Sequence, residues 1–205
     1  MKVRYGHVSN SSSSSFIVGV DKPLDSLASV REQIFHYAGA NTDGYVSHEY
    51  SGYDPIHINV LCEQVLAQAQ ENMVRDDLGE DVPCPSTIEG IMNDSSILDS
   101  IGWNEIYNDR SLSRAHYDEL PRPEYDSEGH FVPSEAYTKA NREHHDKWEA
   151  IAQKLGKEAL EKARPMFENK HIYFMTFADE NGHIGSHLEH GPHWNHITHI
   201  RISNH

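Results

Sequence analysis

Apolar and polar side chains alternate at the start of the chain, over residues 2–8, as they do in a strand with one buried face. The next segment, residues 9–15, is almost entirely serine, and its polar side chains predict a loop. Residues 16–20 form an uninterrupted apolar run, which is typical of a strand covered on both faces. We therefore expect two N-terminal strands joined by a serine-rich loop.

Helical spacing of apolar residues follows this region. Asp25 or Ser26 can cap a first helix, for which Gly39 is the stop signal. Asp54 followed by Pro55 gives a second N-cap with proline at the first helical position. A helix is expected to begin at each of these caps.

A third helix and a long fourth helix are predicted farther along the chain. Ser86 and Glu89 have the spacing of a capping box. Ser134 can cap the longest helix, whose apolar stripe continues until Pro165. Residues 109–133, which precede that helix, are rich in charge, proline and tyrosine and lack periodicity. They predict an extended insertion over the surface.

The C-terminal region carries the remaining strand signals. Residues 171–178 are apolar on both faces, and the Asn181-Gly182 dipeptide after them favours a two-residue hairpin turn. This hairpin would pair Met175 with Leu188, Phe174 with Glu189, and Thr176 with His187. Residues 197–203 alternate, and the polar face of this last strand continues to the chain end; it comprises His199, Arg201, Ser203 and His205.

Strands at both ends with helices between them predict the α+β class. We expect one antiparallel sheet built from the N- and C-terminal strands, with the helical middle region packed on it. A length of 205 residues fits a single domain, residues 1–205, that carries residues 109–133 as an insertion.

The charge balance limits the partners. There are 17 Lys and Arg against 32 Asp and Glu, so the formal net charge is -15. Such a surface repels phosphate backbones, so direct nucleic-acid binding is not expected, whereas a cation or a basic protein partner fits. Two isolated cysteines suit a reducing compartment, and no apolar run has the length of a signal peptide or a membrane span. We therefore expect a cytoplasmic protein without membrane association.

Histidines are concentrated at the C-terminal end, where half of the 16 lie within residues 171–205. On the predicted hairpin His187 shares a face with Glu189, and on the last strand His199 shares a face with His205. If those faces meet, these four residues form a divalent-metal site, for which zinc is the expected ion. The alternative is a polar hairpin of solvated histidines.

The serine-rich loop is the second candidate for chemistry. Its hydroxyl and backbone N–H groups could surround a phosphate group or another anion, as a glycine-rich loop does. The sequence lacks the glycine and lysine pattern of a P-loop, so the alternative is a flexible low-complexity loop.

Two other histidine patterns allow different interpretations. His7 and His196 each begin an H-x-[ST] motif, and such a pair resembles the general base and general acid of 2H phosphoesterases. His7 shares a strand face with apolar residues, however, which favours burial. His145 and Glu149 are one helical turn apart and could hold a metal, but such a pair is more often exposed.

The two ends of the chain also resemble one family. The N-terminal V-R-Y-G-H-V-S-N-S-S-S-S-S-F-I-V is similar to an opening, G-[aromatic]-V-S-N-S-S-S-S-S-F, of uncharacterised bacterial and phage proteins. The C-terminal F-A-D-E-N-G-H-I-G-S-H-L-E-H-G and the final I-R-I-S-N-H are similar to theirs as well. At position 7 this chain has histidine where the family has an aromatic residue. The resemblance implies kinship and a phage or prophage setting.

The resemblance also implies that the two ends form one site. On that basis substrate binding is expected of Ser9, Asn10, Ser11 and Ser12. Catalysis is expected of Glu189, His190 and His205.

The first functional hypothesis is a metal-dependent hydrolase that acts on a phosphate ester or a nucleotide. A bound metal would lower the pKa of its water and so supply the nucleophile. The alternative is a non-enzymatic acidic interaction protein, such as a phage-encoded inhibitor of a host protein, which would use an acidic helical face or residues 109–133.

Overall fold

The structure is a computed structural model of the 205-residue chain, and it describes residues 13–36, 44–46, 55–75, 81–123, 125–132, 134–178 and 182–203. The chain divides into two compact units, Met1–Ile91 with Arg164–His205, and Met92–Ala163. The expected single domain stays a prediction.

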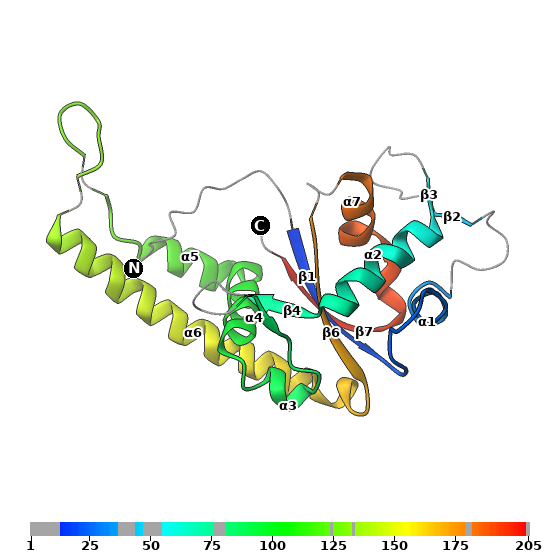
Figure 1. The fold of residues 1–205 in the computed structure, drawn as a ribbon. Coiled ribbons are helices and arrows are strands. Elements are labelled where there is room, and N and C mark those ends of the chain that lie inside the picture. The colour runs from blue at the N-terminus through cyan, green and yellow to red at the C-terminus, as the bar shows by residue number, and fades with distance from the viewer. Residues whose placement is uncertain are drawn as a thin grey trace. The chain divides into compact units, whose positions relative to one another are not determined.

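The first unit contains an antiparallel sheet in which segments from the two ends of the chain are neighbours. β1 (Ser13–Val20) lies between β6 (His171–Ala178) and β7 (Thr198–Ser203) (Figure 1). Ile17 is opposite Phe174 on one side and Ile200 on the other. The central position of β1 explains its uninterrupted apolar run, because both of its faces are buried. The predicted loop over residues 9–15 is wrong for its last three serines, which are the start of β1, while residues 9–12 lie outside the described residues. The predicted α+β class is confirmed.

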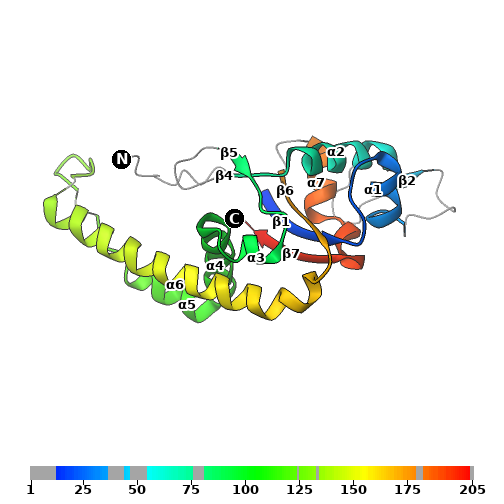
Figure 2. The ribbon, with the colours of Figure 1, turned by 60° about the horizontal axis from the view of Figure 1, so that its bottom comes forward.

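Helices cover one face of this sheet. They are α1 (Leu27–Gln33), α2 (Ile58–Glu71) and α7 (Gly182–His190), which lie on the same side of the strands in Figures 1 and 2. Burial of apolar side chains between the two layers is the main stabilising contribution. This core contains Phe16, Val18, Met175 and Phe177 from the strands, and Val30, Ile34, Leu61, Val65 and Leu188 from the helices.

Side-chain caps determine where the helices of the first unit begin. Ser26 caps α1 by accepting a hydrogen bond from the N–H of Ser29, which selects Ser26 from the two predicted caps. The N-cap of α2 is His57, whose Nδ1 accepts from the N–H of Asn59, so Pro55 is not its first helical residue. Asp54, the predicted cap, lies outside the described residues.

Short elements fill the remainder of the first unit. β2 (Tyr45–Val46) pairs with β3 (Ile56–His57), and β4 (Met73–Arg75) pairs with β5 (Asp81–Pro83). The short helix α3 spans Ile88–Ile91. Its cap is Thr87, whose Oγ1 accepts from the N–H of Gly90 at 3.1 Å, and not the predicted Ser86.

Close packing of two helices defines the second unit. α4 (Ser95–Asn108) packs on α6 (Glu135–Phe167) through Gly102 and Gly156. A Cβ atom on Gly102 would lie 1.7 Å from the carbonyl oxygen of Ala152, so only glycine permits this approach. The predicted cap Ser134 accepts from the N–H of Tyr137 at 3.1 Å, which confirms the start of α6. Pro165 lies inside its last turn and does not end the helix.

A buried histidine lies at the centre of an aromatic cluster in this unit. His116 is 8% exposed, and burial is the main cause that lowers its pKa. His144 stacks on it with ring centroids 4.9 Å apart, and the Nε2 atom of His144 is 3.1 Å from the His116 carbonyl oxygen. The other rings of the cluster belong to Trp103, Tyr107, Tyr117 and Trp148.

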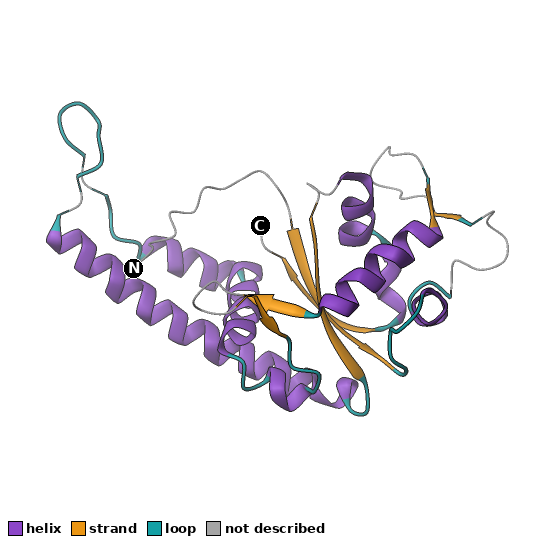
Figure 3. Cartoon of the chain, in the orientation of Figure 1, coloured by secondary structure: helices purple, strands orange, loops and turns teal. Residues whose placement is uncertain are grey.

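The predicted insertion over residues 109–133 is partly helical. α5 forms over Arg110–Asp118, as Figure 3 shows. Asp109 caps it, since Oδ1 accepts from the N–H groups of Ser111 and Leu112. α5 was not predicted from the sequence because most of its side chains are polar, so it has no stripe of apolar residues at helical spacing.

The predicted Asn181-Gly182 hairpin is wrong. Residues that would form its second strand form α7 instead, in which Ile184 and Leu188 are one turn apart and pack on the core. The position beside β6 that was expected for the second strand of the hairpin is occupied by β1. Met175 is therefore opposite Phe16 rather than Leu188, Phe174 is opposite Ile17 rather than Glu189, and Thr176 is opposite Ser15 rather than His187.

Candidate functional site

The start of β1 lies beside the end of β7. Ser14 is the Cα partner of Ser203 on one side and of Phe177 on the other. The described segments nearest to the two chain ends are thus neighbours, as the sequence hypothesis of one shared site requires. The predicted residues Ser9, Asn10, Ser11, Ser12 and His205 lie outside the described residues, and their roles stay predictions.

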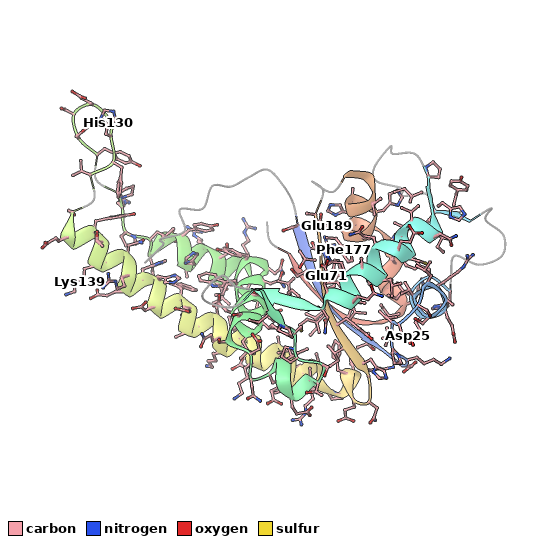
Figure 4. The ribbon with its side chains drawn as sticks, in the orientation of Figure 1. Asp25, Glu71, His130, Lys139, Phe177 and Glu189 are labelled. Carbon is pink, nitrogen blue, oxygen red and sulfur yellow. The ribbon has the colours of Figure 1, made fainter. Side chains whose placement is uncertain are left out.

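A hydrogen-bond network, buried on its Glu189 side, joins β1, α7 and β7 at this position. The Oγ atom of Ser14 donates to Oε1 of Glu189 at 3.0 Å. Arg201 donates to the same Oγ atom from Nε at 3.2 Å and from Nη2 at 3.0 Å. In the view of Figure 4, Glu189 lies between α7 and the strands. Ser14 therefore connects a buried carboxylate to a guanidinium group.

The Glu189 carboxylate needs these neighbours. Its side chain is 0% exposed, and a buried carboxylate without compensating groups costs several kcal/mol (about 3–5). Two basic groups lie near its two oxygens: Arg201 Nη2 is 4.0 Å from Oε1, and His190 Nε2 is 3.5 Å from Oε2. The buried carboxylate is therefore flanked by two basic side chains.

The two basic groups reach solvent, although the carboxylate does not. The side chain of Arg201 is 40% exposed and that of His190 is 33% exposed. Arg201 also extends over the ring of Phe16, with its guanidinium carbon 5.8 Å from the ring centroid. Packing on that ring restricts the guanidinium orientation. The site can therefore present a fixed guanidinium and an imidazole to an anionic ligand.

His187 and Glu189 do not share a strand face, as the predicted metal site required. They are two residues apart on α7, a rotation of about 200° in a helix. His187 is 0% exposed and its ring stacks near that of His193, with centroids 6.5 Å apart. His187 is thus part of the core on this side of the sheet.

His199 remains on β7, where its Nδ1 atom is 3.1 Å from the carbonyl oxygen of Ile197. Within the described residues, no three His, Cys, Asp or Glu side chains form a group that could hold a metal ion. A metal site at this end of the sheet would therefore have to include residues beyond the described ranges, such as His205.

The two alternative histidine patterns occupy other places. His196 ends the 3₁₀ helix Pro192–His196 and is not on a strand, which the 2H arrangement required. His7 lies outside the described residues. On α6, His145 is exposed and 3.8 Å from Glu149, while His144 packs against His116. This pair is a surface contact of the kind expected on an exposed helix.

Ser14 and Arg201 are the site residues that sequence reasoning did not single out. Arg201 belongs to the polar face predicted for the last strand, and Ser14 is one of a run of similar serines. These two residues can be recognised only from the register in which β7 pairs with β1, and the sequence does not specify that register.

Comparison of the chain with protein-family models, with curated proteins and with solved structures gives no match. The family resemblance of its two ends therefore stays a prediction. Among the helices that the structure describes, none is both long and apolar enough to cross a bilayer.

Proposed function

We propose that the chain binds a phosphate ester or a nucleotide at the start of β1, next to α7 and the end of β7. We further propose that it hydrolyses this ligand. The observation that supports the proposal is the Ser14–Glu189–Arg201 network, in which one buried carboxylate holds two partly exposed basic side chains. Groups fixed in this way are suited to bind an anion without reorganisation.

Each basic group has a role in the proposed reaction. Arg201 binds phosphate oxygens through the donors that do not contact Ser14, and it stabilises the charge that develops on them. His190 accepts a proton from the attacking water as the new bond from water oxygen to phosphorus forms. It then returns the proton to the leaving oxygen as the ester bond breaks, which yields an alcohol and phosphate.

Glu189 acts through its neighbours in this scheme. It lies 3.5 Å from His190 and receives the hydrogen bond of Ser14, so it orients both His190 and Arg201. Glu189 is thus a positioning residue, while the serines at positions 9–12 and His205 remain proposed ligand-binding and catalytic residues.

A divalent metal, with zinc as the expected ion, is a further part of the proposal. Of the predicted ligands, His187, Glu189 and His199 do not form one group within the described residues, so His205 and other residues beyond the described ranges would have to complete the site; the chemical contribution of the metal would be a bound water of lowered pKa. Metal analysis of tag-free protein, followed by assays with and without a chelator, tests this part separately from the roles of Arg201 and His190.

The experiment is a set of hydrolysis assays with p-nitrophenyl phosphate and nucleoside triphosphates on the full chain, with added zinc, with magnesium and without metal. We expect His190→Asn to lower kcat about 10²-fold or more, because general acid–base catalysis contributes that much. Arg201→Lys should raise KM and lower kcat, and Glu189→Gln should lower kcat more than it raises KM.

Matched controls are available on the surface of the same unit. Arg164 pairs with Glu89 at 2.9 Å, and His171 is exposed at the start of β6. Arg164→Lys and His171→Asn should leave both kinetic constants unchanged. Absence of hydrolysis by the wild-type chain under every metal condition, or equal losses in site and control variants, would contradict the proposal.

A second candidate is an interaction protein, and the loop over residues 125–131 favours it. Tyr125 is 62% exposed and forms an isolated bridge to Phe131, whose ring packs on that of Tyr137 in α6. Asp126 orders the turn by accepting from the N–H groups of Glu128 and His130. His130 lies on the part of this loop that extends away from α6 (Figure 4). An ordered loop that exposes an aromatic ring is typical of a binding surface.

The negative charge of this loop favours a positively charged partner. Asp126 and Glu128 belong to the same loop, where their carboxylates lie 3.4 Å and 3.7 Å from Nδ1 of His130, and Glu135 is in the first turn of α6. We propose that the loop binds a basic protein segment, whose arginines stack on Tyr125 and pair with these carboxylates. Tyr125→Ser should weaken binding of an Arg-Gly repeat peptide about fivefold, a typical loss for one cation–π contact. Tyr45→Ser, which changes another exposed tyrosine, should leave the affinity for the peptide unchanged. Equal losses of affinity in the two variants would contradict the proposal.

A further inference from the structure

A polar cavity of about 320 Å³ lies at the opposite end of β1 from Ser14. Its walls come from the end of β1, the end of α1, the residues just before β6, and the start of β7. The volume falls within the range of small-ligand sites, which are concave and carry a few convergent polar groups.

Basic side chains from separate segments converge on this cavity. Lys22 follows β1, Lys170 precedes β6, His36 follows α1, and His196 ends the 3₁₀ helix before β7. The rings of His36 and His196 meet edge to face, with centroids 6.0 Å apart. Such convergence is notable in a chain with 17 Lys and Arg against 32 Asp and Glu.

Each lysine is paired with a carboxylate that is itself mostly in solvent. Lys170 Nζ contacts Asp21 at 2.5 Å, where the lysine side chain is 26% exposed and the aspartate 79%. Lys22 Nζ contacts Glu32 at 2.8 Å, where both side chains are more than 60% exposed. The ammonium of Lys170 lowers the pKa of Asp21, so that carboxyl stays charged. Exposed ion pairs contribute little to stability, so a ligand with several contacts can replace these carboxylates.

We propose that this cavity binds a small organic anion, carrying carboxylate or phosphate, through Lys170, Lys22 and the His36–His196 pair. The anion takes the place of Asp21 and Glu32 as the partner of the two lysines. Thr198 and the backbone of Gly19 also line the cavity. This site is independent of the proposed hydrolase site, because it shares no residue with Ser14, Glu189 or Arg201.

Titration of the full chain with succinate and with inorganic phosphate tests the proposal, with backbone amide NMR shifts as the readout. The shifts at Gly19 and Thr198 should saturate, and the anion that binds more tightly identifies the ligand chemistry. Lys170→Gln should weaken that binding about tenfold or more, the usual loss for a hydrogen bond to a charged group.

A second variant should change the affinity for the anion in the opposite direction. Asp21→Asn removes the competing carboxylate from an exposed position, so it should strengthen anion binding and leave the fold unchanged. The matched control is Lys162→Gln, which removes an exposed charge from α6 near Lys154 and Lys157. Non-saturating shifts, or equal weakening by Lys162→Gln and Lys170→Gln, would overturn the proposal, since both indicate general attraction of anions to lysines.

Discussion

The hydroxyl group of Ser14 donates a 3.0 Å hydrogen bond to the carboxylate of Glu189, although 175 positions separate the two residues in the chain. Ser14 is at the start of the central strand and Glu189 is near the end of α7. Both are buried, and Arg201 of the neighbouring strand donates to the same hydroxyl oxygen. One small side chain thus links the N-terminal strand to two C-terminal elements.

Ser14→Ala should destabilise the first unit. The substitution removes a donor from a fully buried carboxylate and an acceptor from Arg201, and an unsatisfied buried group costs about 1–3 kcal/mol. Urea unfolding followed by circular dichroism measures the loss. The control is Ser15→Ala, because the Ser15 hydroxyl is also buried but meets the neutral hydroxyl of the exposed Thr176 at 2.9 Å rather than a charged group, so its loss should cost less. Equal losses in the two variants would mean that the link to Glu189 adds nothing.

Two glycines of the second unit should respond differently to alanine. A Cβ atom at Gly102 would lie 1.7 Å from a backbone oxygen of α6, so Gly102→Ala forces the helices apart and should cost about 1–3 kcal/mol or more. Gly129 has a φ of 85° with nothing within 4 Å of its Cβ position, so Gly129→Ala should cost only about 1 kcal/mol of backbone strain. Thermal unfolding of both variants checks the order, and a larger loss for Gly129→Ala would refute it.

The stability of the second unit should fall as the pH is lowered through the titration range of His116. Burial and the nearby His144 lower the pKa of His116 below its ordinary value of 6.5 in the folded state. The unfolded chain therefore binds the proton first as the pH falls, so the stability is complete well above pH 6.5 and is lost as the pH falls through that value. The melting temperature should drop between about pH 7.5 and about pH 5.

His116→Phe tests the source of this pH dependence, because phenylalanine fits an aromatic cluster and does not titrate. The variant should lose most of the decline over that interval. The carboxyl of Glu119 also loses stabilisation in acid, since its pKa is lowered by the hydrogen bond from Lys147, but this occurs below the ordinary value of 4.5. A decline in the variant that matches the wild type would assign the effect to other groups.

Much of the fold follows from local sequence signals. The apolar run of β1, the caps Ser26 and Ser134 and the strand over His171–Ala178 were all predictable, because each depends on residues adjacent in sequence. α7 was not, because Asn181-Gly182 favours a hairpin locally. The partner that β6 takes in the structure is β1, which is distant in the chain.

The candidate site shows the same limit. Glu189 and His190 could be selected from the sequence because they stand among unusual histidines. Arg201 could not, because its contact with Ser14 depends on the register of β7 against β1. The prediction that His187 and Glu189 share a strand face is wrong for the same reason as the hairpin. It assumed the two-residue period of a strand, whereas the chain forms a helix there.

The most direct test of the proposed site is a titration of the full chain with inorganic phosphate, in which NMR follows the arginine Nε–Hε resonances. The Arg201 resonance should shift and saturate, and Glu189→Gln should weaken that response, while the resonance of Arg164 stays in place. An unmoved Arg201 resonance, or parallel shifts of Arg201 and Arg164, would contradict the assignment of Arg201 as the phosphate-binding group.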